Sequence, residues 1–319
     1  MDISEDTTTV NDQVAARPIT VSIAAVERDT GLSKDTLRVW ERRYGFPTPE
    51  RDPFGERAYT LEQIEKLRVI RRLLDSGHRP GRIVSLDIAT LHSIGQSLSP
   101  TPQRMGGASA IDLRSYMDLI KNHDTDGLRR ALAQACMRMG VASMVCDVIA
   151  PLNVMVGDAW IRGTLEVFEE HMYTESVHIA LRSAIANAPV APASASPRVL
   201  MTTLPQEPHG LGLLMAEAML SLEGCCCLSL GTQTPILDTV LAATAYRCAV
   251  VALSFTANQN PNYVIHSLEE LRQKLPADID IWAGGNCPAL QRKQLSGIAV
   301  ITDLRGIGGF MDTWRAQRM

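Results

Sequence analysis

The chain has 319 residues, 45% of them hydrophobic and 21% charged, a composition typical of a globular protein with two or three domains. It has no run of about 18 uncharged apolar residues, and its acidic N-terminus lacks the basic-then-apolar order of a signal peptide, so we expect neither a membrane span nor export. Seven Cys form no C-x-x-C pair, which favours reduced thiols in the cytoplasm.

Charge is distributed unevenly along the chain. Residues 17–82 hold 14 Lys and Arg against 10 Asp and Glu, whereas residues 83–319 hold 17 against 21. Residues 1–16 carry four acids and no base, and we expect them to form a disordered acidic tail. A basic module beside an acidic body indicates a polyanionic partner for the module alone.

Two stretches rich in Pro, Ser, Gly and Ala are predicted to be linkers, residues 93–110 and 188–197. They separate three predicted domains, residues 17–92, 111–187 and 198–319. The fold class expected from these segments is a multidomain α and α/β protein.

The first domain begins with a helix-turn-helix pattern. A short helix over residues 22–28 is followed by a turn at residues 30–32 and a second helix over residues 33–43, with Ser33 as its N-cap. Residues 44–59 are rich in Pro and Gly and are predicted to form a wing, after which Thr60 caps a long amphipathic helix. In the second helix, two apolar residues can face the core and four cationic residues the outside: Leu37 and Trp40, then Lys34, Arg38, Arg42 and Arg43.

The segments "ITVSIAAVERDTGLSKDTLRVWERRYG", "GERAYT" and "LEQIEKL", in this order, resemble the MerR family of winged helix-turn-helix regulators. The resemblance implies that the second helix enters the major groove of operator DNA and that the wing grips the backbone. A small helical domain with a solvated basic face is the alternative. The implied DNA contacts are Ser33, Thr36, Arg38 and Arg43 on the helix, with Arg57 and Tyr59 in the wing.

The middle segment is helical throughout and long enough for a four-helix bundle. It contains the pattern W-x9-E-H, formed by Trp160, Glu170 and His171. Gly163 and Thr164 between them have the character of a C-cap followed by an N-cap, which predicts two helices meeting at a corner. A core Trp and a surface Glu-His pair would give the same pattern.

The last segment alternates apolar runs with helical patterns, which predicts a doubly wound, Rossmann-like parallel sheet. Its five predicted strands span residues 198–203, 225–230, 248–255, 279–284 and 298–303. The consecutive residues Cys225, Cys226 and Cys227 lie in the second strand, where alternation prevents all three from binding one ion, and we interpret them as core.

Ligands of such sheets lie beyond the carboxyl ends of the strands, and three groups of candidate residues fall there. Each group alone would fit a surface His or glycines that turn the chain. The groups are Glu207, His209 and Gly212 after the first strand, Ser254 and Thr256 after the third, and Gly284 and Gly285 after the fourth.

The order E-x-H-x-x-G, S-x-T, G-G resembles the cobalamin-binding domain of methionine synthase and the corrinoid-dependent mutases. The resemblance implies that His209 becomes the lower cobalt ligand and that Glu207 orients it, where many relatives have Asp. It also implies that Gly212 lets the backbone approach the cofactor. Ser254, Thr256, Gly284 and Gly285 would line the tunnel for the nucleotide tail.

Beside such a domain, W-x9-E-H resembles the signature of the CarH/LitR photoreceptor regulators. The resemblance implies that the bundle covers the upper face of adenosylcobalamin, with Trp160 over the adenosyl group and Glu170 and His171 hydrogen-bonded to it. Some members have a second His directly after the Trp. Here that residue is Ile161, which cannot ligate cobalt, although His171 or His178 could substitute.

The resemblance implies a cytoplasmic, non-enzymatic repressor that binds double-stranded operator DNA and senses light through adenosylcobalamin. It implies a homo-oligomer, a tetramer in the dark, that separates when light breaks the cobalt–carbon bond. One alternative is a regulator that responds to cobalamin or a protein partner without light, which Ile161 motivates. The other is a corrinoid carrier or enzyme domain, which the DNA-binding module opposes.

Overall fold

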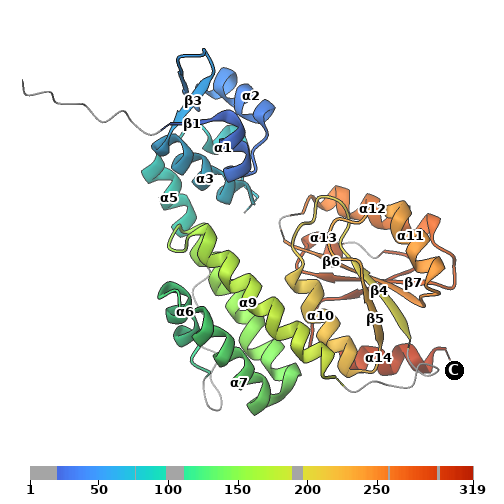
Figure 1. Ribbon diagram of the computed structural model, residues 1–319. Coiled ribbons are helices and arrows are strands. Elements are labelled where there is room, and N and C mark those ends of the chain that lie inside the picture. Colours follow the sequence, from blue (N-terminus) through green and yellow to red (C-terminus); the bar gives the residue numbers. More distant parts are fainter. Residues whose placement is uncertain are drawn as a thin grey trace, which may run out of the picture. The chain divides into compact units, whose positions relative to one another are not determined.

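The computed structural model describes residues 20–75, 77–97, 111–188, 197–257, 259–292 and 295–318 (Figure 1). The chain divides into two compact units, residues 1–97 and 98–319. The predicted acidic tail lies outside the described residues, as do residues 98–110 and 189–196 of the predicted linkers. The prediction that the first linker begins at residue 93 is wrong, because helix α5 (Ile88–Ser97) continues through it while Leu91 and Ile94 pack on the core.

The N-terminal unit is a winged helix-turn-helix. Ser22 caps its first helix by accepting a hydrogen bond from the Ala25 backbone, and Gly31, at a φ of 66°, ends that helix. The three strands form an antiparallel sheet in the order β1-β3-β2, in which β2 and β3 are the predicted wing. The elements are β1 (Thr20–Ser22), α1 (Ile23–Thr30), α2 (Lys34–Tyr44), β2 (Glu50–Arg51), β3 (Arg57–Thr60), α3 (Leu61–Asp75), α4 (Pro80–Ile83) and α5.

The C-terminal unit begins with the predicted helical bundle. Its segments are α6 (Leu113–Lys121), α7 (Thr125–Ser143), the π-helical η1 (Met144–Ile149), α8 (Ala150–Ile161) and α9 (Val167–Ala186). Gly140 breaks α7, since its φ of 79° and ψ of 166° belong to no right-handed helix. The helical path on both sides of this break therefore supplies two of the four helices.

By length and apolar composition, the path Thr125–Ile161 is the one described helix that could cross a membrane. Its apolar side chains are instead used inside the protein. Leu128 and Leu132 before the break, and Val148 and Leu152 after it, are fully buried in the core of the C-terminal unit. The path is thus a core element of the bundle.

The rest of this unit is the predicted parallel sheet, and all five predicted strands are confirmed. Their order is β5-β4-β6-β7-β8, with every described pair parallel. The strands are β4 (Arg198–Thr202), β5 (Cys226–Ser229), β6 (Val250–Phe255), β7 (Asp280–Gly285) and β8 (Ile298–Ile301). The helices between and after them are α10 (Leu211–Leu222), α11 (Ile236–Ala245), α12 (Pro261–Lys274), α13 (Pro288–Arg292) and α14 (Ile307–Ala316).

Strand alternation divides the buried residues between the two faces of the sheet. Val199 and Val250 pack with α10, α14 and the bundle, whereas Leu200 and Val251 pack with α11, α12 and α13. The bundle and one face of the sheet therefore share a continuous hydrophobic core. The bundle, residues 111–187, was predicted to be a separate domain, but it belongs to the same compact unit as the sheet.

The three consecutive cysteines alternate as predicted, but one of them is not core. Cys225 is buried, and burial raises its pKa to about 11. Cys226 is exposed, and β5, to which it belongs, is an edge strand of the sheet. The interpretation of all three as core is therefore wrong at Cys226.

Candidate functional site

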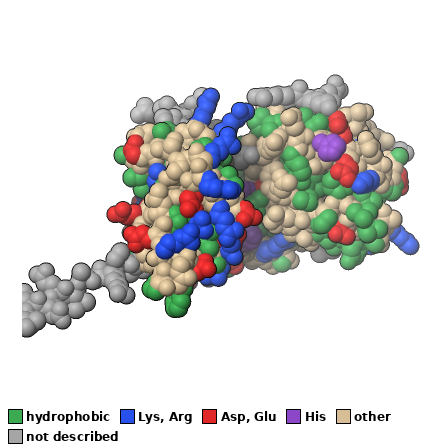
Figure 2. Space-filling view, turned by 90° about the horizontal axis from the view of Figure 1, so that it is seen from above, with side chains coloured by type: hydrophobic (Ala, Val, Ile, Leu, Met, Phe, Trp, Pro, Cys, Tyr) green, Lys and Arg blue, Asp and Glu red, His purple; other side chains and the backbone are tan. Residues whose placement is uncertain are grey.

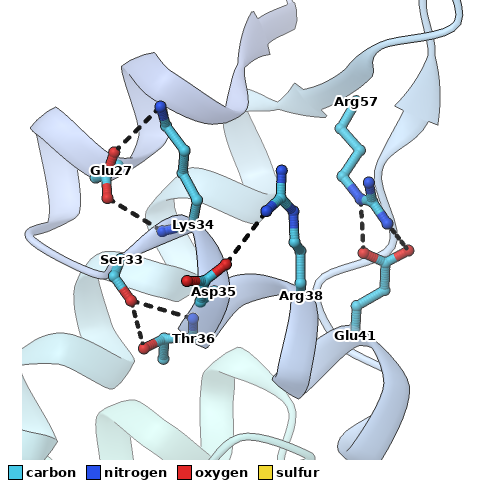
Figure 3. A network of polar contacts seen from close by, with 8 residues as sticks. All are labelled: Glu27, Ser33, Lys34, Asp35, Thr36, Arg38, Glu41 and Arg57. Atoms are coloured by element: carbon cyan, nitrogen blue, oxygen red, sulfur yellow. Dashed lines mark hydrogen bonds and ion pairs between the residues drawn. The ribbon is translucent and has the colours of Figure 1, made fainter.

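Helix α2 is held in place from its N-terminus. The Ser33 hydroxyl accepts a hydrogen bond from the Thr36 backbone at 3.1 Å and lies 2.8 Å from the Thr36 hydroxyl, which confirms Ser33 as the N-cap (Figure 3). Leu37 and Trp40 are buried beneath the helix, as predicted. Ser33 and Thr36, two of the residues predicted to contact DNA, are thus hydrogen-bonded to each other. Any contact that they make with DNA would be made from this N-cap.

The outer side of α2 is mostly cationic. Arg38, Arg42 and Arg43 are exposed, and Arg38 pairs with Asp35 at 3.2 Å. The Arg43 guanidinium stacks 5.4 Å from the centre of the Tyr44 ring. Figure 2 shows Lys and Arg side chains gathered over the N-terminal unit, the surface that a polyanion would approach.

The wing is tied to the recognition helix by an ion pair that the sequence did not reveal. Arg57, on β3, donates to Glu41 of α2 through Nε at 2.8 Å and Nη2 at 3.4 Å, and both side chains are half-buried (Figure 3). The hydrogen bond with Glu41 raises the pKa of Arg57. Arg57 therefore fixes the wing against the helix, in addition to adding positive charge.

Tyr59 requires a correction. Its side chain is fully buried in the core of the N-terminal unit, so it is not part of the exposed surface predicted to contact DNA. Its hydroxyl has no hydrogen-bond partner among the described residues, and burial raises its pKa. Aromatic bulk on the inward face of a short strand explains the burial, which the residue type alone did not predict.

The second candidate site lies in the C-terminal unit, where the loop after β4 carries Glu207 and His209. Glu207 is 1% exposed, and its Oε1 accepts from Nδ1 of His209 at 2.7 Å and from the His209 backbone N–H at 3.1 Å. The His209 side chain is 58% exposed. With Nδ1 donating to the carboxylate, Nε2 is the nitrogen whose lone pair could coordinate a metal.

Thr256 completes the support of Glu207 from the end of β6. The second carboxylate oxygen, Oε2, accepts from the Thr256 backbone N–H at 2.8 Å and from its hydroxyl at 2.7 Å. Burial would raise the pKa of Glu207, but the hydrogen bonds from His209 and Thr256 together hold that pKa below its usual value. The Glu207 carboxylate is therefore charged, accepts two hydrogen bonds on each oxygen, and holds the His209 imidazole in one orientation.

The remaining predicted residues lie at the same edge of the sheet. A Cβ on Gly212 would lie 3.0 Å from the Ser254 hydroxyl, so the start of α10 and the end of β6 meet there. Ser254 pairs with Gly284 in the sheet register. A Cβ on Gly285, whose φ is 106°, would lie 2.2 Å from the Phe255 carbonyl oxygen, so the strand pairing itself requires this glycine. The structure thus brings together all seven residues predicted for this edge.

The residues of the W-x9-E-H pattern lie on two bundle helices, as predicted. Trp160 is in the last turn of α8, and Glu170 and the exposed His171 are near the start of α9. The cap of α9 was predicted wrongly. Glu166, in a capping box with Glu169, caps this helix instead of Thr164, because the chain makes a longer turn after Gly163.

A contact between the two helices shows which faces these residues share. The Tyr173 hydroxyl of α9 donates to Asn153 of α8, and Asn153 in turn contacts the Met215 sulfur of α10 at 3.6 Å. Trp160 follows Asn153 by seven residues, two helical turns, and therefore lies on the same side of α8. Glu170 precedes Tyr173 by three residues on α9, so the two residues are neighbours on the surface of that helix.

Two ion pairs join the bundle to the α/β part, and neither was predicted. Asp147, in η1, pairs with Arg305 in the loop after β8. Arg182 of α9 pairs with Glu217 of α10 at 2.7 Å, where Glu217 is only 6% exposed. The partners of these two pairs are 158 and 35 residues apart in the sequence, so local sequence patterns do not indicate either pair.

Two family models match the chain. Residues 21–86 match the MerR HTH family regulatory protein model, and residues 113–184 match a model described as B12 binding domain. The second match covers the helical bundle that contains Trp160, Glu170 and His171.

The chain is also similar over most of its length to two repressors of Myxococcus xanthus. It is 29% identical to the HTH-type transcriptional repressor CarH over 85% of this chain and 90% of that protein. It is 30% identical to the HTH-type transcriptional repressor CarA over 79% of this chain and 82% of that protein. Among solved structures, the monomethylamine corrinoid protein of Methanosarcina barkeri matches 62% of this chain and 95% of its own, with a TM-score of 0.49 and 14% identity. The chain therefore belongs to the family of the CarH and CarA repressors, as a DNA-binding transcriptional regulator with a cobalamin-binding domain.

Proposed function

We propose that the chain is a cytoplasmic, non-enzymatic repressor that uses adenosylcobalamin to sense light, with His209 as the lower ligand of its cobalt. The observation that carries this proposal is the hydrogen bond from His209 Nδ1 to the buried Glu207 carboxylate. A neutral imidazole that donates from Nδ1 to a carboxylate keeps Nε2 as its coordinating nitrogen, which suits cobalt, and the carboxylate partner raises its basicity. The donor set therefore fits the group.

When bound, adenosylcobalamin supplies a cobalt–carbon bond that visible light breaks. Under this proposal, Ser254, Thr256, Gly284 and Gly285 line the site of the nucleotide tail, and Gly212 lets the backbone approach the cofactor. Trp160 covers the adenosyl group, and Glu170 and His171 bind it through hydrogen bonds. Their positions on the two helices that meet at Asn153 and Tyr173 support this arrangement.

For the readout, we infer that Trp160, Glu170 and His171 hold the bundle over the α/β part in the dark. Four copies of the chain then bind a double-stranded operator. In the light the bundle shifts against α10, the tetramer separates, and the operator is released. The ion pairs of Arg182 and Asp147 with residues of the α/β part lie on the interface that would shift.

A second candidate keeps cobalamin but not light. Ile161, at the end of α8, offers no ligand to cobalt where some related regulators have a His. A regulator that reports cobalamin itself would still change colour in light, but its DNA affinity would stay the same, which separates the two candidates. A corrinoid carrier is disfavoured by the complete DNA-binding unit.

The ligand assignment is tested by His209→Ala in the full chain, with His266→Ala, an exposed residue of α12, as the matched control. After reconstitution with adenosylcobalamin in darkness, His209→Ala is expected to lose the spectrum of histidine-ligated cobalamin and to bind the cofactor about tenfold to 100-fold more weakly. His266→Ala should match the unmodified chain. An unchanged spectrum and affinity in His209→Ala would remove His209 from the site.

A further inference from the structure

Helix α2 presents one exposed apolar side chain in the middle of its charged outer stripe. Val39 is 43% exposed, and its neighbours on the same stripe, Asp35, Arg38 and Arg42, are exposed as well. These positions recur at intervals of three and four residues, so they form one continuous line along the helix.

Val39 does not belong to the hydrophobic core described for its own unit. The inward face of α2 is formed by Leu37 and Trp40, and the half-buried Glu41 is bound to Arg57. Val39 is not among the described residues that build or border the core of the N-terminal unit. Single exposed apolar residues are common on protein surfaces, so the case for a partner depends on the charged residues that surround Val39.

The charges around Val39 match a polyanion. Three arginines, Arg38, Arg42 and Arg43, accompany it on α2 against the single exposed acid Asp35, which already binds Arg38. A neighbouring protein surface would have to bury these cations at a cost, whereas DNA phosphates neutralise them. The apolar side chain between them would then face the base edges.

The major groove offers one apolar feature on its base edges, the C5-methyl group of thymine. We propose that Val39 packs against the C5-methyl of a thymine in each operator half-site and makes that base a determinant of specificity. The valine side chain suits this contact, because a β-branched residue in a helix is restricted to essentially one rotamer and loses little entropy on binding. The inference rests on the placement of α2 in the major groove.

The test uses the full chain, reconstituted with adenosylcobalamin and kept in darkness, and duplexes that it enriches from a random DNA pool. Each thymine of the enriched site is replaced in turn by deoxyuridine, which removes only the C5-methyl group. We expect one thymine per half-site at which this replacement weakens binding by about fourfold, the value for one buried methyl group. Val39→Ala should weaken binding to the unmodified site by a similar factor, and the deoxyuridine site should then show no further loss.

Two controls make the outcome decisive. Ile88→Ala removes an apolar side chain of similar exposure from α5 and should leave affinity unchanged. Alanine favours helix more than valine does, so α2 persists in the variant, and circular dichroism checks this. If no deoxyuridine replacement weakens binding, or if every such loss is additive with Val39→Ala, the inference is overturned while DNA binding stands. A chain that enriches no duplex would overturn both the inference and the operator-binding function.

Discussion

A single carboxylate oxygen of Glu207 binds both the ring and the backbone of His209, at 2.7 Å from Nδ1 and 3.1 Å from the backbone nitrogen. The other oxygen is bound twice by Thr256. The orientation of His209 is therefore set by two strand ends, those of β4 and β6, which are neighbours in the sheet. A rigid sheet edge positions the proposed cobalt ligand.

Glu207→Gln should weaken this arrangement, because an amide nitrogen cannot accept from Thr256 or His209. We expect the free energy of unfolding to fall by about 1–3 kcal/mol at pH 7 and cobalamin to bind about tenfold to 100-fold more weakly. Urea denaturation and a cofactor titration measure the two effects. Thr244→Val, on the exposed side of α11, is the control and should change cofactor affinity little.

The stability effect of Glu207 should depend on pH in a defined direction. Its hydrogen bonds hold its pKa below the usual value, so its contribution is present above the unfolded pKa of about 4.3 and is lost as the pH falls through the lower folded pKa. The difference in unfolding free energy between the unmodified chain and Glu207→Gln should therefore shrink below about pH 4. A difference that stays constant down to pH 2 would contradict this account.

Gly285→Ala should disrupt the edge of the sheet. Its φ of 106° strains any residue with a Cβ, and that Cβ would lie 2.2 Å from the Phe255 carbonyl oxygen. We expect a loss of about 2–4 kcal/mol in unfolding free energy. Gly309→Ala, in open space on α14, should instead stabilise the helix by about 0.5–1 kcal/mol. Equal effects of the two substitutions would show that Gly285 is not constrained as described.

Arg182→Ala should leave the buried Glu217 without its cation. Burial already raises the pKa of Glu217 even with Arg182 beside it. Because Arg182 is half-exposed and partly screened by water, we expect a loss of about 1–3 kcal/mol, and the double variant Arg182→Ala/Glu217→Gln should recover most of it.

The cost of Arg182→Ala should shrink in acid, as that of Glu207→Gln does, although the pKa of Glu217 is raised and that of Glu207 is lowered. A carboxyl group with a raised folded pKa favours the protonated native state, so stability falls as pH rises from the unfolded pKa through the folded pKa. The cost of Arg182→Ala should thus be largest at neutral pH and smallest near pH 4, which chemical denaturation at several pH values measures. A double variant no more stable than the single one would show that the buried charge is not the cause.

Glu41→Gln separates positioning from charge at the DNA-binding surface. Removing an acid would raise DNA affinity if net charge alone mattered. Because Glu41 holds Arg57 and the wing, we expect affinity to fall by about threefold to tenfold instead, since a charge-assisted pair is lost. Titration of the operator at fixed salt measures it, and a rise in affinity would contradict the role of Arg57 in fixing the wing.

Periodicity predicted most of the fold. The five strands of the sheet, the bundle and the helix-turn-helix with its Ser33 cap all follow from local patterns, and the structure confirms them. The edge of the sheet was predictable too, because the carboxyl ends of parallel strands must meet, which placed Glu207, His209 and Thr256 together.

Several features that the sequence did not predict depend on long-range packing. Cys226 is exposed on β5, which is an edge strand, and the order of strands in a sheet cannot be predicted from local sequence patterns. Tyr59 is buried because its side chain packs in the core with residues of α1, α2 and α3, which lie elsewhere in the sequence. The pairs of Arg57 with Glu41 and of Arg182 with Glu217 join distant segments, which only the tertiary structure brings together.

We propose that the chain assembles in darkness around adenosylcobalamin and separates in light. The decisive experiment is size-exclusion chromatography with absorbance detection, on the full chain reconstituted in darkness and run before and after green illumination. We expect a coloured tetramer that becomes a smaller coloured species in light. A coloured species of unchanged size would contradict light-driven disassembly, and a colourless protein would contradict cofactor binding itself.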